Sequence, residues 1–382
     1  MSSKRPQQLI FWGNYDTGKP RVRLLVKAAE HLGYQITEIH GHVWDGIEDK
    51  SQIKGIPAKL KILFTILLAY PRLVYRYLKA PKHTHIIIPY LGLLDIFMLW
   101  PFAKLRGSKI HWDMFISLYD SVVNDREMMS KYHPFSLLLF STEWLACRMA
   151  DTVFMDTEPH AAYIGKLFNL PCDSVEWVPV GVESRHFPRQ QYQNSFEPGN
   201  IKVLFYGQFI PLHGVDTILD AAILDKSGHI QWTIVGKGQL SAHIDKRIEQ
   251  EKIKSITRID WEPYDKLVNL IHKCDICLGI FGTSQKAQNV IPNKLYQVMA
   301  VGKPFITANT VGIQSLGLEN NIAILLSKPG DAASLLNKVK TMASRIQQHP
   351  HQVFHAALEL PIIDARAVSV NLEKVIKTIT AH

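Results

Sequence analysis

Short apolar runs alternate with longer stretches in which apolar residues recur every three or four positions. In the first half, the runs predict strands at QLIFWG, YQITEIHG, HTHIIIP, KIHWDMF, DTVFMDT and SVEWVPV, with helices between them such as 21–32, 94–105, 134–149 and 159–168. The series starts again with strands KVLFYG, QWTIVG, ITRIDW, ICLGIFG, PFITANT and AILLSKPG, and with helices beginning near Gly214, Gly238, Tyr264, Asn293 and Asp331. Strands that alternate with helices predict parallel sheets covered by helices.

A polar stretch, ESRHFPRQQYQNSFEPGN, separates the two series, and its Pro, Asn, Gln and Gly content predicts an exposed linker. A chain of 382 residues exceeds what one compact core usually holds. We therefore expect an α/β protein with two doubly wound, Rossmann-like lobes and a ligand in the cleft between them. The expected boundaries are 1–182 for the first lobe, 183–200 for the linker, 201–360 for the second lobe and 361–382 for a segment whose helix, 364–380, returns to the first lobe.

Composition places the chain among ordinary globular proteins, because 47% of its residues are apolar and 20% are charged. The first residues, MSSKRPQQLIFWG, lack the apolar core and cleavage site of a secretory signal. Four cysteines do not make a disulfide framework in a chain of this length. These features predict a reducing, cytoplasmic compartment.

The formal charge of +9 predicts an anionic partner, and much of it flanks one apolar stretch within 59–82. This apolar run is too short to span a bilayer. It suits either a helix lying in the interface of an anionic membrane, on the inner face of the plasma membrane, or an ordinary helix packed on a sheet. We expect no nucleic-acid partner.

Two segments of the second half carry the chemistry: Val203-LFYGQFIPLHGVDTILDAA-Ile223 and Asn289-VIPNKLYQVMAVGKPFIT-Ala308. Together they resemble the retaining family-4 glycosyltransferases of the GT-B fold. Supporting segments occur in the expected order, namely Ile234-VGKGQL, the turn beginning at Trp261, and Val178-PVGVESRHF. In the first half, Asp113-MFISLYDSVVNDR-Glu127 is similar to a branch found in bacterial surface-polysaccharide clusters.

The resemblance implies a hexosyltransferase that moves sugar from a nucleotide sugar to a lipid-linked or polysaccharide acceptor with retention of configuration. The nucleotide sugar is a co-substrate, and no cofactor is expected. No two aspartates stand two positions apart, so the Asp-x-Asp pair of metal-dependent sugar transferases is missing. The sequence therefore favours a mechanism without metal.

The leaving diphosphate gains negative charge, which cations and the N–H groups of a helix N-terminus stabilise. Lys294, at the start of the helix NKLYQVMAV, is the main candidate, and a solvated helix lysine is the alternative. The donor-binding candidates are Gly207, Gln208, His213, Gly214, Lys286, Asn289, Asn293, Lys294 and Gln297. Many relatives have Arg and Lys at the places of Gln208 and His213, and Glu at those of Asn289 and Gln297. Lys294, Lys286 and a protonated His213 would have to compensate for the missing cations.

The first lobe offers a catalytic carboxylate at Asp113, with Asp120 and Arg126 as alternatives on the following segment. Asp113 could instead cap the chain that follows its strand. Gly13 would let a phosphate approach the first loop, with Lys19 and Arg21 nearby.

Two other functions remain open from the sequence. A nucleotide-sugar epimerase shares the two-lobed fold, although the paired carboxylates and histidines expected of it are not evident. A degenerate transferase would bind only a nucleotide or a partner, and the residues at 208, 213 and 297 favour that reading.

Overall fold

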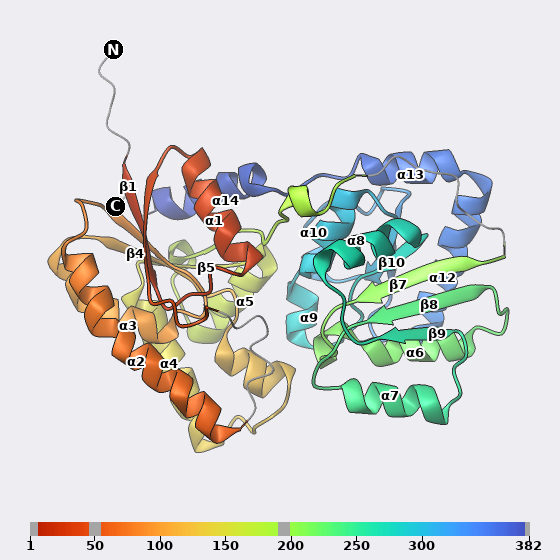
Figure 1. Ribbon diagram of the computed structural model, residues 1–382, viewed down its shortest axis with the longest axis horizontal. Coiled ribbons are helices and arrows are strands. Elements are labelled where there is room, and N and C mark those ends of the chain that lie inside the picture. Colours follow the sequence, from red (N-terminus) through yellow and green to blue (C-terminus); the bar gives the residue numbers. More distant parts are fainter. Residues whose placement is uncertain (1–6, 46–54, 190–198, 379–382) are drawn as a thin grey trace, which may run out of the picture. The chain divides into compact units, whose positions relative to one another are not determined.

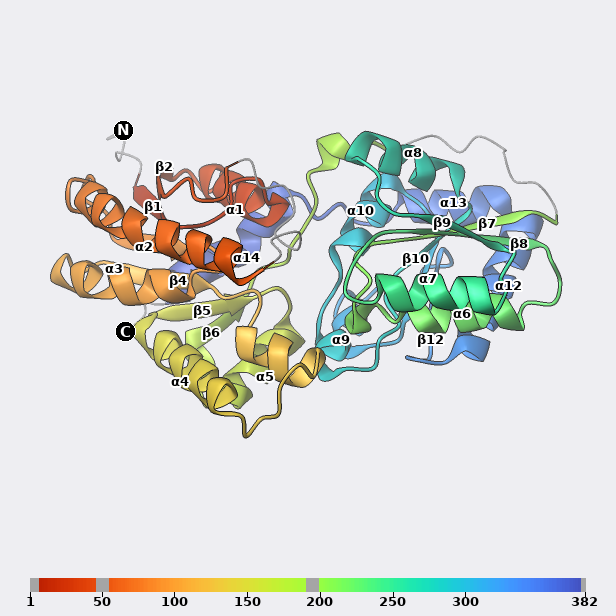
Figure 2. The same cartoon turned by 60° about the horizontal axis from the view of Figure 1, so that its bottom comes forward.

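The computed structural model describes residues 7–45, 55–189 and 199–378, drawn in Figures 1 and 2. The chain forms two compact units. The first contains Met1–Val123, Glu127–Gly181 and Asp364–His382, and the second contains Asn124–Arg126 and Val182–Ile363. Residues 190–198 of the expected linker and the last two residues of the helix expected over 364–380 lie outside the described residues.

The first unit is built on a six-stranded parallel sheet of order β2-β1-β3-β4-β5-β6. Its strands are β1 (Gln8–Gly13), β2 (Gln35–His40), β3 (His85–Ile88), β4 (Lys109–Asp113), β5 (Thr152–Met155) and β6 (Val175–Trp177). All four residues of β3 are buried, as expected for a central strand covered on both faces. Each strand lies within a run that the hydrophobic pattern predicted.

The helices of the first unit are α1 (Pro20–His31), α2 (Ile56–Leu78), α3 (Leu93–Leu105), α4 (Pro134–Met149), α5 (Glu158–Phe168) and α14 (Ala365–Lys377). Across the sheet, the chain moves one way from β1 to β2. It moves the other way from β2 to β3, from β3 to β4 and from β4 to β5. Because such connections are right-handed, α1 covers one face of the sheet and α2, α3 and α4 cover the other. Helix α14 packs along α1 (Figure 1).

Local signals explain where several helices begin. Helix α1 has Pro20 at its first position, where the missing N–H costs no helical hydrogen bond. The Thr157 hydroxyl accepts from the backbone N–H of His160, 3.1 Å away, and caps α5. The Asp364 carboxylate does the same for α14 at the N–H groups of Arg366 and Ala367.

The basic apolar segment of the sequence forms α2. One side of this helix packs on the sheet through the buried side chains of Tyr70, Leu73 and Tyr77. The opposite side exposes large apolar side chains to solvent. None of the described helices combines the length and apolar character needed to cross a lipid bilayer.

The second unit holds another six-stranded parallel sheet, of order β12-β11-β10-β7-β8-β9. Its strands are β7 (Ile201–Tyr206), β8 (Ile230–Val235), β9 (Ile256–Ile259), β10 (Ile276–Leu278), β11 (Phe305–Ala308) and β12 (Ile324–Ser327). The helices are α6 (Val215–Leu224), α7 (Ser241–Gln250), α8 (Tyr264–Lys273), α9 (Gln285–Asn289), α10 (Asn293–Val301), α11 (Val311–Gln314), α12 (Ala332–Gln348) and α13 (Pro350–Leu358).

Two parallel sheets with helical crossovers confirm the expected α/β architecture. The sequence pattern did not indicate the short helices α9, α11 and α13, nor the π-helical turn over Asp120–Asp125. Helices of four or five residues are too short to show a hydrophobic period, which explains why α9 and α11 could not be predicted.

Candidate functional site

Glycines bring three loops together at the carboxyl edge of the second sheet. Gly207 follows β7 with a φ of +144°, and Gly214 precedes α6 in the left-handed conformation. A Cβ at Gly236, after β8, would lie 1.8 Å from the carbonyl oxygen of Gly207. A Cβ at Gly214 would lie 2.5 Å from the backbone of Phe281, after β10. The loops after β7, β8 and β10 therefore pack backbone against backbone, and side chains at these positions would force them apart.

Lys294 comes to this edge from the first turn of α10. Its side chain is buried, with 5% of the residue exposed. The ammonium nitrogen Nζ lies 3.8 Å from the centre of the Phe205 ring and donates to the carbonyl oxygen of Gly279 over 3.3 Å. A Cβ built at Gly207 would stand 3.0 Å from the same nitrogen. The ammonium group therefore lies directly beneath the glycine turn that follows β7.

The charge of Lys294 has no acidic counterpart in the part of the chain that the structure describes, where no carboxylate forms an ion pair with it. Burial lowers the pKa of Lys294 well below its usual range. The N-terminus of α10, which carries Lys294, also has no side-chain cap. A buried cation beside uncapped N–H groups is an electrostatic arrangement that an anion would stabilise.

His213 stands beside Lys294 on the loop after β7. Its Nδ1 hydrogen-bonds to the backbone carbonyl oxygen of Gln208, which can only accept, so Nδ1 carries the proton. Burial lowers the pKa of His213 well below its usual value, and the charge of Lys294 lowers it further. Both effects disfavour the protonated imidazole in the protein without ligand. A protonated His213 beside a bound diphosphate, as the sequence suggested, stays a prediction.

The remaining donor-binding candidates lie on the same loop and on the two helices after β10. The side chains of Gln208 and Asn293 are exposed, those of Lys286 and Gln297 are half-buried, and that of Asn289 is buried. Their contacts with a donor stay predictions.

In the first unit, Asp113 and Arg21 form a buried ion pair. Arg21 donates from Nε and Nη2 to the Asp113 carboxylate over 2.7–3.0 Å, and from Nη1 to the carbonyl oxygen of Val178. Asp113 has no exposed surface, and Arg21 is buried as well. The structure therefore gives both residues an internal role that ties α1 to β4, in place of the cap considered for Asp113.

Gly13 has an equally internal neighbour. A Cβ there would lie 2.3 Å from Oδ2 of Asp95. This oxygen accepts from the backbone N–H of Asn14, and the other carboxylate oxygen, Oδ1, accepts from the Tyr70 hydroxyl. Burial raises the pKa of Asp95. The position that a Cβ of Gly13 would take is thus occupied by Asp95, and the approach of a phosphate to this loop stays a prediction. Lys19 lies at the start of α1, 3.8 Å from Asp16.

The segment after β4 is held by a carboxylate that the sequence analysis did not single out. Glu143 of α4 is buried and accepts from the Ser117 hydroxyl and from the backbone N–H groups of Leu118 and Tyr119 over 2.6–3.1 Å. The available signal was that Glu143 is the one acidic residue of the helix expected over 134–149.

The two other catalytic candidates of this segment differ in exposure. Asp120 is buried and accepts from the hydroxyl of Tyr163 over 2.8 Å, whereas Arg126 is exposed. Tyr163 of α5 thus holds the Asp120 carboxylate in place by a hydrogen bond, whereas the Arg126 side chain is accessible to solvent.

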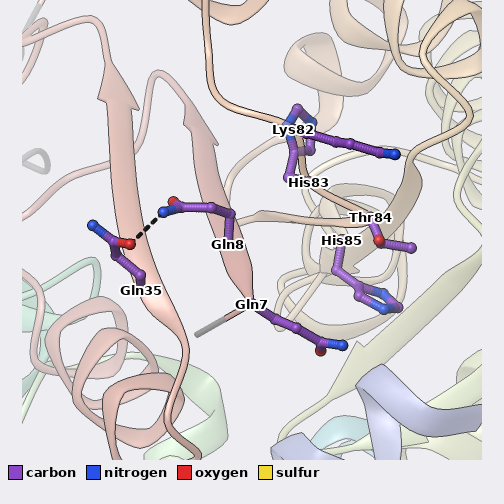
Figure 3. Close-up of a pocket in the computed structure, with 7 residues that line it drawn as sticks. All are labelled: Gln7, Gln8, Gln35, Lys82, His83, Thr84 and His85. Carbon is purple, nitrogen blue, oxygen red and sulfur yellow. Dashed lines mark hydrogen bonds between the residues drawn. The ribbon is translucent and has the colours of Figure 1, made fainter. Parts of the chain in front are cut away.

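A pocket of about 580 Å³ lies at the opposite, amino edge of the first sheet (Figure 3). The Gln8 side chain of β1 donates to that of Gln35 of β2 over 2.6 Å. Figure 3 marks this hydrogen bond with a dashed line. The lining residues are Gln7, Gln8, Gln35, Lys82, His83, Thr84 and His85. All of these residues belong to the first unit, and none of them is a candidate site residue. Ligands of open parallel sheets bind at the carboxyl edge, whereas this pocket lies at the amino edge.

Comparison with known proteins gives a family match to the second unit. Residues 200–345 match the family model described as glycosyl transferases group 1. Over 106 residues the chain is 27% identical to WcaI of Escherichia coli strain K12, which is named as a colanic acid biosynthesis glycosyl transferase. This alignment covers 28% of the chain and 26% of WcaI.

Solved structures resemble the chain over nearly its full length. Sucrose-phosphate synthase from Thermosynechococcus elongatus superposes with a TM-score of 0.70 at 15% identity, covering 98% of this chain and 99% of that one. HepE of Anabaena, solved in complex with UDP, gives 0.66 at 12% identity, covering 97% of this chain and 100% of that one. The fold is that of the GT-B glycosyltransferases, and within it residues 200–345 of the second unit match a glycosyltransferase family model.

Proposed function

We propose that this protein transfers a hexosyl group from a nucleotide sugar to a lipid-linked or polysaccharide acceptor, with retention of configuration and without a metal ion. The donor class is supported by the family match over 200–345 and by HepE, a relative in fold that binds UDP. The acceptor class is supported by the local similarity to WcaI. Metal independence is proposed because the sequence has no Asp-x-Asp pair.

The observation that carries this proposal is Lys294. A buried ammonium group without a carboxylate partner is costly unless a ligand supplies the missing negative charge. The Lys294 nitrogen lies beneath the glycine turn at Gly207, and α10, which carries Lys294, begins without a side-chain cap. A diphosphate placed there would meet a cation, a helix N-terminus and backbone close enough to exclude water.

The reaction breaks the bond between the anomeric carbon and the diphosphate oxygen and joins that carbon to an acceptor oxygen. The acceptor proton moves to the departing phosphate, so no protein nucleophile is required. Lys294 would stabilise the charge that collects on the diphosphate. Among the catalytic candidates, Arg126 is exposed, whereas Asp113 is enclosed with Arg21. We therefore assign Asp113 to the architecture of the first unit.

The test is calorimetric titration of the whole chain with UDP, GDP, ADP and CDP, with chelator present throughout. Lys294→Met keeps the length of the side chain and removes its charge, so we expect a loss of affinity of about tenfold or more. Lys303→Met is the matched control. Lys303 follows α10, and its ammonium donates to the carbonyl oxygens of His272 and Cys274 at the end of α8. This variant should bind nucleotides like the parent.

Turnover is then followed as release of nucleoside diphosphate from the matching nucleotide sugar, with membrane extract as acceptor. Release that depends on the extract supports the transferase. Conversion of the donor without extract would identify the epimerase instead. Binding of no nucleotide at all would favour the degenerate scaffold suggested by Gln208, His213 and Gln297.

A further inference from the structure

Helices α2, α3 and α4 lie side by side on one face of the first sheet (Figures 1 and 2), where α3 contacts both of its neighbours. We call their outer surface the three-helix face. A helix on the surface of a globular protein normally turns polar side chains to water. The three-helix face does the opposite.

The apolar stripe is clearest on α2. Phe64 and Leu68 are each 63% exposed, although they are large side chains one helical turn apart. The exposed apolar residues of α2 are Leu60, Leu63, Phe64, Leu67, Leu68, Tyr75 and Leu78. Their spacing of three and four positions places them on one side of the helix, opposite the buried Leu73 and Tyr77. Helix α2 is therefore apolar on the side facing the core and again on the side facing solvent.

The neighbouring helices extend this surface. Leu105 at the end of α3 is 83% exposed, and Leu138 of α4 is 62% exposed. The other exposed apolar residues of the two helices are Leu94, Met98, Trp100, Phe135, Leu137, Trp144 and Leu145. Exposed apolar side chains on three adjacent helices exceed the scattered apolar residues that are normal on soluble proteins.

Within the three helices, the described acidic side chains do not reach solvent. Asp95 and Glu143 are the acidic residues of α2, α3 and α4, and both are buried under hydrogen bonds. The described charged side chains that reach solvent on these helices are Lys61, Arg72, Arg76, Lys104 and Arg148. Lys104 pairs with Asp151 over 3.2 Å, and Arg76 and Arg148 donate to backbone carbonyl oxygens of β2 and of the end of α5. The charges that the proposal uses are therefore those of Lys61 and Arg72, which are exposed on α2. Trp144 stacks with Arg148, whose guanidinium carbon lies 3.8 Å from the ring centre. Aromatic rings beside basic groups are typical of membrane interfaces.

We propose that the three-helix face binds the surface of an anionic lipid bilayer, with its apolar side chains in the headgroup region and its basic side chains against lipid phosphates. A second copy of the chain is a poorer occupant, because a two-fold interface would bring positive charges onto positive charges. A neutral apolar partner would leave the charges of Lys61 and Arg72 uncompensated. The proposal goes beyond the sugar transfer proposed above and does not depend on it.

Co-sedimentation of the whole chain with vesicles tests the proposal without any nucleotide or acceptor. We expect binding to vesicles of phosphatidylcholine with phosphatidylglycerol, and far less binding to phosphatidylcholine alone. Lys61→Glu/Arg72→Glu should weaken the former by roughly 25-fold or more, since each basic side chain contributes about fivefold. Phe64→Ser/Leu68→Ser should weaken it by at least about tenfold. Because the changed side chains are exposed, both variants should keep the thermal unfolding midpoint and the nucleotide affinity of the parent.

Two control variants make the same kinds of substitution at exposed positions outside the three-helix face. Lys246→Glu/Lys254→Glu makes the same charge change on exposed residues of the second unit, and Val370→Ser removes an exposed apolar side chain from α14. Both should bind vesicles like the parent. The proposal would be overturned if the parent does not bind anionic vesicles. It would also be overturned if the parent binds them and neither variant of the three-helix face binds more weakly. A dimer, seen by sedimentation velocity, that Phe64→Ser/Leu68→Ser converts to monomer would overturn it as well, because a second copy would then cover the face.

Discussion

Arg21 and Asp113 stand 92 positions apart in the sequence, yet the Arg21 guanidinium donates hydrogen bonds to both carboxylate oxygens of Asp113 inside the first unit. The closest of these contacts, from Nη2, is 2.7 Å long. The ring of Phe115 covers the guanidinium, whose carbon lies 4.6 Å from the ring centre. The pair thus anchors the start of α1 to the end of β4 without contact with solvent.

This pairing predicts that Asp113→Asn unfolds the first unit more readily, because it leaves a buried guanidinium without its counter-charge. We expect a loss of about 3–5 kcal/mol in the free energy of unfolding. Arg21→Met/Asp113→Leu removes both charges and should lose clearly less than Asp113→Asn. Urea denaturation followed by circular dichroism measures both. Full stability of Asp113→Asn together with lost turnover would return Asp113 to a catalytic role.

Glu143 predicts a dependence of stability on pH. Burial raises the pKa of its carboxyl group to about 7, from 4.5 as the reference value for the unfolded chain. A carboxyl group with a higher pKa in the folded chain binds more protons when folded, so its contribution to stability falls as the pH rises from about 4.5 through 7. The change amounts to about 3 kcal/mol in total.

Urea unfolding of the parent and of Glu143→Gln between pH 5 and about 8 isolates this contribution. The neutral amide cannot ionise, so the variant should lose less stability than the parent over this interval. A constant difference between the two proteins at every pH would show that Glu143 keeps the same protonation state in the folded and unfolded chains.

Lys294 predicts that protons are taken up when a nucleoside diphosphate binds. Burial lowers the pKa of this lysine in the free protein, and an adjacent anion favours the charged form and raises it again. Calorimetry in HEPES and in Tris gives the number of protons bound, because the two buffers differ in ionisation enthalpy. We expect net uptake by the parent above neutral pH and less uptake by Lys294→Met. Any uptake that remains would report on His213, whose pKa is also lowered. Equal uptake by both proteins would exclude Lys294 as the group that titrates.

We predict that Gly207→Ala weakens nucleotide binding, whereas the same substitution at Gly33 does not. Gly207→Ala would place a methyl group 3.0 Å from the Lys294 nitrogen and 3.1 Å from the His213 ring. Gly33→Ala adds the same group at another positive φ, where nothing lies within 4 Å. Both changes should cost about 1–3 kcal/mol of stability through backbone strain. Only Gly207→Ala should weaken nucleotide binding by about tenfold or more, as measured by titration with UDP.

The sequence predicted every strand of both sheets because central parallel strands are short, β-branched apolar runs bounded by turns. Ile86–Ile88 and Val203–Phe205 are examples, and both are buried throughout. The sequence also placed Lys294 at the start of a helix, where α10 begins with Asn293. Periodicity and turn residues are local signals, so one chain suffices to detect them.

The surroundings of the candidate residues could not be predicted in the same way, because they depend on contacts between distant segments. Nothing near Asp113 indicates that Arg21 fills the space around its carboxylate. Nothing near Gly13 indicates that Asp95, from the helix after β3, occupies the space beside it. The partner of a buried charge is set by packing, which a pattern along the chain does not contain.

Helix α14 joins the first unit although its residues come last in the chain. Its apolar side, including Val368 and Leu372, is buried, the helix packs on α1, and the Thr378 hydroxyl donates to Glu176 beside it. During synthesis, the ribosome therefore makes the whole second unit before it makes the segment that completes the first. Until then the outer side of α1 stays open to chaperones and proteases, and a premature stop before Asp364 would leave the first unit without its final helix.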